Sequence, residues 1–263
     1  MEQKTLIDHL GRTVEYSYPP KKIVSIAPGL TDTLYALNLD NEIVGRTRYC
    51  IYPKNKVEQA KTVGGTKKIN LEAINTLNPD IIFAEKEENT KEIVELLEKH
   101  FPTYVCEVKS IDDAHKMIKD LGIATNRTSE AEALSDFIRE KFTTLPQAKN
   151  KRVAYVIWKN PYMVVGNDTY IQSLLEEMGF ENAFKSFEGR YPVVTEEDLQ
   201  HVKLDYLLLA SEPFPFTEEH KQEFSFLPDV KKVIIDGEMF WYGPRMIEAV
   251  DYLKSWFKNL SDH

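Results

Sequence analysis

Residues 71–84, Leu-Glu-Ala-Ile-Asn-Thr-Leu-Asn-Pro-Asp-Ile-Ile-Phe-Ala, join a short helix to a buried strand. The apolar residues from Leu71 to Leu77 have helical spacing, and Pro79 ends the helix. Residues 81–84 form a compact apolar run, which is typical of a buried strand. The chain therefore contains an α-then-β unit at this point.

The same arrangement recurs at residues 196–210, Glu-Glu-Asp-Leu-Gln-His-Val-Lys-Leu-Asp-Tyr-Leu-Leu-Leu-Ala. Glu72 precedes Asp80 by eight positions, and Glu197 precedes Asp205 by the same eight. An earlier pair of helical segments also corresponds, residues 34–43 with residues 174–183. Two matched segments in the same order predict two similar α/β lobes with a ligand cleft between them.

Both halves open on a strand pattern, at residues 22–27 and 152–158. In the first half a helix is expected over residues 31–39, with Thr31 or Asp32 as its N-cap. Residues 111–144 read as helix almost throughout, with a break near residues 122–125. We therefore expect an α/β lobe over residues 1–122, a single long bridging helix over 123–148, and a second α/β lobe over 149–263.

Composition excludes several classes of protein. The 263 residues have a net charge of −9 and scattered lysines, which argues against a nucleic-acid partner. No run of about 18 apolar residues could span a membrane, and the first 16 residues lack the apolar core of a signal peptide. The sequence thus fits an extracytoplasmic protein whose leader is absent from this chain, or a cytoplasmic one.

Cysteine and histidine placement gives no support to a metal site. Cys50 and Cys106 lie 56 residues apart without zinc-type spacing, and they are either buried thiols or a pair joined in an oxidising compartment. The six histidines fall in tails or on expected helices. Because the common hydrolase, phosphate-loop and zinc-protease motifs are also missing, we expect no catalytic residues, and a binding protein rather than an enzyme.

The loops that follow the expected strands are rich in aromatic residues and arginine. One of them, Glu-Met-Phe-Trp-Tyr-Gly-Pro-Arg at residues 238–245, places three rings before a Gly-Pro turn. Rings offer a large contact area at little conformational cost, and arginine adds bidentate contacts to carboxylate or phosphate groups. At any one position a ring that caps the core is an equal explanation, and Arg245 opens the last helix. The candidates are Tyr49, Tyr52, Trp158, Tyr191, Phe214, Phe216, Trp241 and Tyr242, with Arg46, Arg48, Arg190 and Arg245.

Several of these motifs together resemble the helical-backbone (class III) periplasmic substrate-binding proteins of ABC importers, and they are most similar to the cobalamin-binding branch. The resemblance covers about residues 20 to 258 and rests on the segments 20–28, 48–53, 63–72, 78–80, 211–216 and 241–245. It implies a monomer that binds a metal chelate such as cobalamin, haem or a ferric siderophore between its lobes. It also implies an ABC permease and its ATPase as partners, and no resident cofactor.

The resemblance assigns roles to four residues. Tyr49 and Tyr191 match positions where cobalamin binders place an aromatic residue against the corrin. Glu72 and Glu197 match an acidic pair that docks into arginine pockets of the permease, although each also suits the first turn of a helix, where the dipole favours a carboxylate. Near Thr66 the family can have a large aromatic residue that this chain lacks, and Trp241 is the candidate to replace it.

The sequence therefore predicts a carrier of a cobalamin-like corrinoid, with haem or a ferric siderophore as the alternative ligand. A cytosolic enzyme or metallochaperone that uses Cys50 is the alternative of another class. The expected ligand-binding residues are Arg48, Tyr49, Tyr52, Trp158, Arg190, Tyr191, Phe214, Trp241, Tyr242 and Arg245, and the expected docking residues are Glu72 and Glu197.

Overall fold

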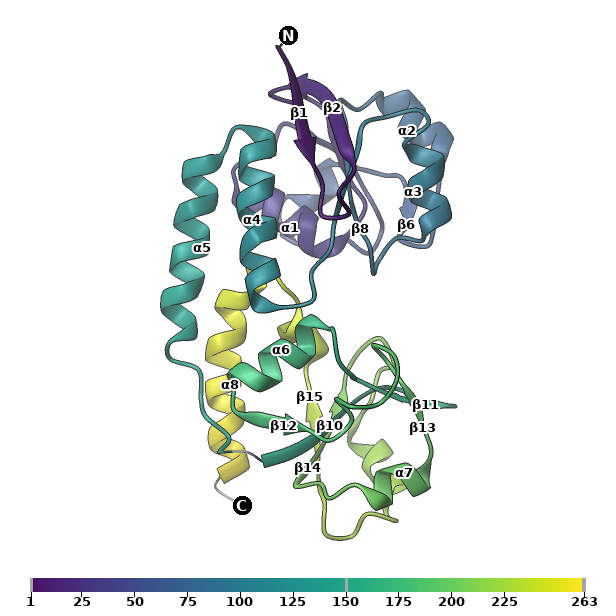
Figure 1. Ribbon diagram of the computed structural model, residues 1–263, viewed down its shortest axis with the longest axis vertical. Helices are drawn as coiled ribbons and strands as arrows, with labels where there is room; N and C mark the ends of the chain where they lie inside the picture. The colour runs from purple at the N-terminus through teal and green to yellow at the C-terminus, as the bar shows by residue number, and fades with distance from the viewer. Residues whose placement is uncertain (1, 150, 262–263) are drawn as a thin grey trace. The chain divides into compact units, whose positions relative to one another are not determined.

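Two separate, largely parallel sheets organise the chain (Figure 1). The structure is a computed structural model that describes residues 2–149 and 151–261, without the side chains of residues 260 and 261. The described chain divides into two compact units. Unit 1 contains the residues up to Val108 together with Asp112–Ile138, and unit 2 contains Lys109–Ile111 and the residues from Arg139 onward.

The sheet of unit 1 has five parallel strands in the order β5-β4-β3-β8-β9. The central strands are buried on both faces, which is why they read as short continuous apolar runs in the sequence. The strands are β3 (Ile23–Ser25), β4 (Ile43–Arg46), β5 (Lys61–Thr62), β8 (Ile81–Glu85) and β9 (Thr103–Cys106). The connections between them contain a 3-10 turn, η1 (Val57–Gln59), and a small antiparallel hairpin of β6 (Gly64–Gly65) and β7 (Lys68–Ile69).

The first helices of unit 1 begin where local chemistry favours them. α1 (Pro28–Ala36) starts at Pro28, three residues before the expected N-cap, because a proline in the first turn loses no helical hydrogen bond. Thr31 lies inside this helix, and its hydroxyl donates to Ser25 Oγ at 2.8 Å. α2 (Leu71–Leu77) and α3 (Lys91–Leu97) are capped by Asn70 and Thr90, whose side chains accept backbone N–H groups.

Two helices follow β9 and lie side by side (Figure 1). α4 (Ile111–Thr125) continues through residues 122–125, where a break was expected, and Asn126 with φ of 60° ends it. α5 (Thr128–Phe142) follows after two residues. Gly122 is needed where they meet, because a Cβ there would lie 2.4 Å from Ala131 Cβ. Within the expected bridging helix, 123–148, the structure has the end of α4 and α5, and the boundary between units falls in α5.

An antiparallel hairpin at the N-terminus, β1 (Glu2–Ile7) and β2 (Thr13–Tyr18), is an element that the sequence analysis missed. Val14 and Tyr16 are buried, and the Tyr16 hydroxyl donates to the Ala124 carbonyl of α4 at 2.8 Å. The alternation of Thr-Val-Glu-Tyr-Ser-Tyr at residues 13–18 is the signal that identifies β2.

The sheet of unit 2 has the order β13-β11-β10-β14-β15, with β12 paired to the start of β10. Its core packs apolar residues of β10 and β14 against Phe184, Leu199 and Phe224. The elements are β10 (Lys151–Trp158), β11 (Tyr162–Val164), α6 (Tyr170–Glu177), β12 (Phe180–Asn182), β13 (Val193–Val194), α7 (Glu196–His201), β14 (Tyr206–Ala210), η2 (Glu218–Phe224), β15 (Lys231–Ile235), η3 (Gly237–Phe240) and α8 (Arg245–Ser261).

The predicted repeat is confirmed by the strand pairing. α2 and β8 in unit 1 correspond to α7 and β14 in unit 2, and both strands pair in parallel with the next strand along the chain. At the carboxyl ends, Lys86 N–H donates to the Cys106 carbonyl and Ser211 N–H donates to the Ile235 carbonyl, each at 2.9 Å. Within the described residues, no helix combines the length and apolarity that crossing a bilayer requires.

Candidate functional site

Loops at the carboxyl ends of the parallel strands, called here the carboxyl-edge loops, contain most of the predicted ligand residues. In unit 1 the loop after β4 places Arg48 and Tyr49 on the surface. The guanidinium of Arg48 lies 5.1 Å from the centroid of the Tyr49 ring, and its Nη2 donates to the Tyr49 hydroxyl at 3.3 Å. Half of Tyr49 is exposed. This pair presents a ring and a positive charge together.

Two glycines of the β6–β7 hairpin lie against that pair. The Arg48 N–H donates to the Gly64 carbonyl at 2.8 Å, which attaches the loop to the β6–β7 hairpin. A Cβ on Gly65 would lie 3.1 Å from Tyr49 Cε2, so the ring rests against bare backbone. Thr66 follows as a buried residue rather than a surface aromatic. Tyr52 lies farther along the same loop, half-buried, with Lys54 Nζ 5.4 Å from its ring centroid.

Beneath this surface two buried polar residues connect the loops of unit 1. Glu85 ends β8, and its carboxyl oxygens accept the N–H groups of Glu87, Glu88 and Val108. The Asn89 amide donates to the carbonyls of Ile26 and Thr66 and accepts the Glu85 N–H.

Burial above all, with a smaller effect of the neighbouring carboxylates of Glu87 and Glu88, raises the pKa of Glu85 to about 7, although the backbone donors act to lower it. Sequence reasoning missed Glu85 and Asn89. In the sequence, these two residues are marked by a glutamate at the last position of an apolar strand and an asparagine four residues later.

In unit 2, two predicted rings meet at the ends of β10 and β14. Trp158 is 39% exposed and packs edge-on against Phe214, with ring centroids 5.8 Å apart. Lys159 Nζ lies 5.4 Å from the Phe214 centroid and pairs with Glu223 at 2.6 Å. Phe216, also a candidate for the cleft, is instead a buried core residue at 2% exposure.

The three aromatic residues at 240–242 differ in burial. Phe240 is buried against Tyr155, with centroids 4.8 Å apart. Trp241 is half-buried, and its Nε1 donates to the Glu212 carboxylate. Tyr242, also half-buried, packs edge-on against Tyr170 of α6 at 5.9 Å. Trp241 and Tyr242 therefore remain the accessible rings of this segment.

The arginines on the expected loops are engaged by their own units. Arg190 Nε donates to the Asp168 carbonyl at 2.7 Å, and Gly166 N–H donates to the Arg190 carbonyl at 2.8 Å. Arg245 is only 6% exposed; its guanidinium lies 2.6 Å from Glu248 and 3.5 Å from Glu238. The prediction that Arg245 opens the final helix is confirmed. Arg46, another of the candidate arginines, donates to the Val57 and Thr47 carbonyls. Tyr191, which follows Arg190 in the sequence, is half-buried.

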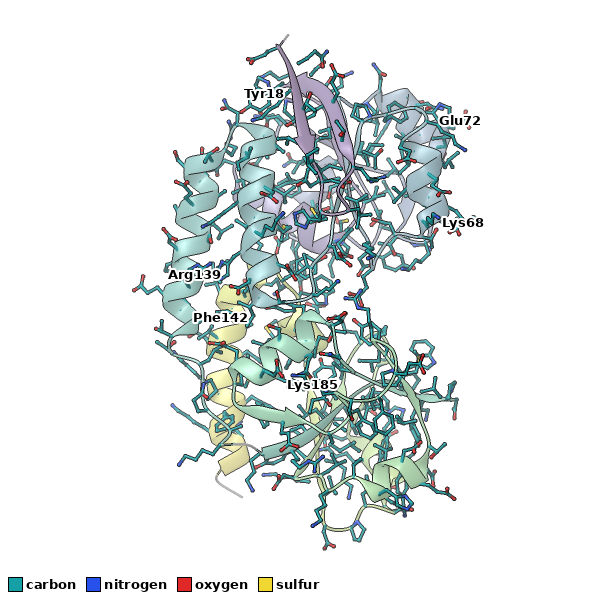
Figure 2. The ribbon with its side chains drawn as sticks, in the orientation of Figure 1. Tyr18, Lys68, Glu72, Arg139, Phe142 and Lys185 are labelled. Atoms are coloured by element: carbon teal, nitrogen blue, oxygen red, sulfur yellow. The ribbon has the colours of Figure 1, made fainter. Side chains whose placement is uncertain are left out.

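Glu72 and Glu197 occupy equivalent places. Glu72 is the second residue of α2 after its Asn70 cap, and Glu197 is the second residue of α7 after its Thr195 cap. Both are exposed, and Figure 2 shows the Glu72 side chain on α2 pointing away from its unit. Each carboxylate is thus favoured by the helix dipole while remaining accessible.

The thiols are buried and free. Cys50 is 1% exposed, with its sulfur in contact with the hydroxyls of Thr31 and Thr47 at 3.1 and 3.2 Å. Burial raises the pKa of Cys50 and of Cys106, which disfavours the reactive thiolate. Across the part of the chain that the structure describes, no three His, Cys, Asp or Glu side chains are grouped so as to hold a metal ion.

Two repeated α/β units, with exposed rings where their strands end, define a binding protein of the two-lobed class. Residues 23–228 match the periplasmic binding protein family, and the chain belongs to that family. Members of this family are carriers rather than enzymes.

Individual relatives agree. The chain is 27% identical over 265 residues to an uncharacterised ABC transporter substrate-binding lipoprotein, YvrC, of Bacillus subtilis, covering 95% of this chain and 83% of that protein. It is 28% identical over 189 residues to the vitamin B12-binding protein of Vibrio vulnificus, covering 69% and 68%. Among solved structures, the periplasmic vitamin B12 binding protein BtuF of Vibrio cholerae superposes with a TM-score of 0.73 at 20% identity, covering 93% of this chain and 99% of that one. Such relatives are periplasmic proteins or lipoproteins, so the family acts outside the cytoplasm.

Proposed function

We propose that this protein captures a metal chelate, a cobalamin-like corrinoid first of all, outside the cytoplasm and delivers it to an ABC permease and its ATPase. Membership of the periplasmic binding protein family supports the carrier role. The relative from Vibrio vulnificus that binds vitamin B12 supports the choice of ligand.

The observation on which the proposal depends is the exposure of rings where the strands end. Tyr49 is 50% exposed and Trp158 is 39% exposed, and each lies against a second flat group, Arg48 and Phe214. Each of these rings, with its flat neighbour, offers a planar surface that a conjugated ligand can cover. A wide, conjugated ligand with polar edges matches both the rings and the guanidinium.

The chelate brings its own metal in this proposal. Among the described residues, no three His, Cys, Asp or Glu side chains are grouped to bind a bare metal ion, and the aromatic residues suit the organic ring system of a chelate. The loop 64–66 has two glycines and a buried threonine where a large aromatic residue would narrow the choice of ligand. Haem and ferric siderophores are therefore the competing ligands within the same class.

Titration of the purified protein with cyanocobalamin, haemin and a ferric hydroxamate siderophore, followed by calorimetry and tryptophan fluorescence, tests the proposal. We expect cyanocobalamin to bind most tightly, with a dissociation constant of about 1 μM or lower. Binding of none of the three chelates would refute the proposal, and a preference for haemin or the siderophore would correct the ligand while keeping the carrier role.

Ring-deletion variants locate the binding. Tyr49→Ala and Trp158→Ala should each weaken binding about tenfold, since a stacked ring contributes about 1 kcal/mol beyond its buried area. Tyr18→Ala is the matched control, because Tyr18, labelled in Figure 2, is a half-buried tyrosine of the N-terminal hairpin. Its ring lies below Lys4 Nζ, and its hydroxyl donates to Asn126. Equal losses in all three variants would indicate damage to the fold instead of a binding site.

A further inference from the structure

Side chains and backbone link two carboxyl-edge loops of unit 2, the loop after β14 and the segment after β15. The Ser211 N–H donates to the Ile235 carbonyl at 2.9 Å, and the Gly237 N–H donates to Ser211 Oγ at 3.1 Å. One residue farther along, Glu212 accepts a hydrogen bond from the indole Nε1 of Trp241. Hydrogen bonds at successive residues therefore hold the two loops together. The last of these bonds runs from the indole N–H of Trp241 to the Glu212 carboxylate.

The approach of Glu212 to η3 requires a glycine. A Cβ on Gly237 would lie 2.4 Å from Glu212 Cγ and 3.3 Å from the Glu212 nitrogen. Any other residue at position 237 would push the Glu212 side chain away from the backbone of η3. The sequence thus pairs a glycine after β15 with a glutamate after β14, and this pairing leaves the carboxylate where the indole can reach it.

The backbone around Trp241 is also fixed on both sides. Phe240 is buried against Tyr155, and Tyr242 packs edge-on against Tyr170, a residue that is 4% exposed. The Trp241 N–H donates to the Glu238 carbonyl at 3.3 Å. With the backbone held, the bond to Glu212 restricts the rotation of the indole about its own side-chain bonds.

We propose that Glu212 is a positioning residue that sets the plane of the Trp241 ring before any ligand arrives. Hydrogen bonds to a carboxylate are shorter and about twice as strong as neutral ones, so one such bond selects a single ring orientation. A ring that is already ordered loses less conformational entropy when a ligand covers it. The inference rests on the proposed function to the extent that the ring serves a chelate.

This arrangement also limits what Trp241 can offer to a ligand. The indole has one polar group, the Nε1–H, and Glu212 occupies it. A ligand that reaches this residue meets its aromatic surface, and aromatic surfaces favour flat conjugated groups over small polar solutes. Trp241 is therefore expected to contribute stacking rather than a hydrogen bond.

The indole N–H signals of the unliganded protein test the positioning step directly. The chain has three tryptophans, so its ¹⁵N spectrum contains three indole peaks that single Trp→Phe variants assign. In Glu212→Ala the Trp241 peak should shift and its hydrogen exchange should become at least about tenfold faster. Glu212→Gln keeps an acceptor oxygen, and it should retain most of the protection.

A matched control is available in unit 2 beside a different tryptophan. Glu223 pairs with Lys159 next to Trp158 and Phe214, and Glu223→Ala should leave the Trp241 peak in place. An unchanged Trp241 peak and exchange rate in Glu212→Ala would overturn the inference, whatever the ligand turns out to be.

Binding measurements test the consequence. With cyanocobalamin as the first probe and haemin as the second, Glu212→Ala should weaken binding about tenfold and Glu212→Gln less than threefold. In a Trp241→Ala background, Glu212→Ala should cause no further loss, because a positioning residue acts only through the ring. A full, independent loss in that background would overturn the inference. If the wild-type protein binds neither probe nor the ferric hydroxamate siderophore, the proposed function fails, while the indole spectra still decide whether Glu212 orients the ring.

Discussion

Asp80 and Asp205 make the same two contacts in the two halves of the chain. The Asp80 N–H donates to the Lys22 carbonyl at 2.8 Å, and its carboxylate accepts the Lys22 N–H at 2.9 Å. The Asp205 N–H donates to the Arg152 carbonyl and its carboxylate accepts the Arg152 N–H, both at 2.8 Å. Each aspartate thus joins the entry of its own strand to the entry of the neighbouring one, which explains why both copies of the repeat have Asp at this position.

Removing either aspartate should destabilise its own unit. We expect Asp80→Ala and Asp205→Ala each to lower the free energy of unfolding by about 1–2 kcal/mol, because backbone donors lose a charged acceptor. The hydrogen bond from Lys151 holds the pKa of Asp205 below its usual value. This contribution is therefore present at neutral pH and fades as the pH falls through the lowered pKa. Urea unfolding at pH 7 and pH 3 checks both points, with the exposed Asp229→Ala as a control.

Glu85 should make stability depend on pH in the opposite direction. Its pKa is raised to about 7 by burial, so its stabilising contribution is complete below the unfolded-state pKa near 4.3 and is lost as the pH rises through about 7. The free energy of unfolding of Glu85→Gln minus that of wild type should rise by about 3 kcal/mol from pH 4.5 to pH 8, because only the wild type must ionise a buried carboxyl group. A stability difference that stays constant across this range would show that the carboxyl group titrates normally.

Gly64 and Gly65 are expected to respond differently to alanine. At Gly64, with φ of 115°, a Cβ would meet the Lys68 carbonyl oxygen at 2.5 Å, so Gly64→Ala should cost about 1–3 kcal/mol of stability. At Gly65 the new atom meets the Tyr49 ring at 3.1 Å, and the exposed ring can move aside. Gly65→Ala should therefore preserve the melting temperature within about 2 °C and weaken chelate binding. Loss of stability in both variants would mean that the Tyr49 ring is rigidly held.

Glu72 and Glu197 are expected to act at the permease. The double variant Glu72→Ala, Glu197→Ala should retain the ligand affinity of wild type and lose at least about tenfold in its stimulation of the permease-coupled ATPase. Glu92→Ala is the control, because Glu92 is also the second residue of its helix, α3, and is exposed. It removes the same interaction with the helix dipole, so equal effects would assign the loss to helix stability rather than docking.

The thiols should be unreactive in the folded protein. Cys50 and Cys106 are at most 1% exposed, and burial raises the pKa of both. We expect both to resist a thiol reagent at pH 8 in the native state and to react fully in denaturant. Rapid reaction of Cys50 in the native state would revive an enzyme or metallochaperone that uses it.

Sequence patterns located the strands and helices of both units because apolar runs and helical spacing are local properties. Errors arose where a tertiary contact decided the outcome. The packing of Tyr16 on α4, 108 residues away, is such a contact: the alternation of residues 13–18 indicates a strand, but it does not show what that strand packs against. The start of α1 at Pro28 is a local effect of proline in the first turn that the expected N-cap at Thr31 or Asp32 overlooked.

The candidate site shows the same division between residue types and their surroundings. The sequence indicated which segments have rings and arginines, and Tyr49, Trp158 and Trp241 are accessible as expected. It did not distinguish Phe240 and Phe216, which are buried, or Arg245, whose guanidinium pairs with Glu238 and Glu248. The type of an aromatic residue or an arginine is the same whether it is buried or exposed, and only the packing around the side chain distinguishes the two cases.

By itself, the sequence determined the α/β class, the internal repeat and the kind of side chain available for binding. These follow from the periodicity of apolar residues and from the spacing of Glu and Asp in residues 71–84 and 196–210. The tertiary structure alone decided that Glu212 meets Trp241 and that Glu85 is buried beneath the loops of unit 1. Hydrogen bonds between distant loops depend on three-dimensional proximity, which the order of residues along one segment does not specify.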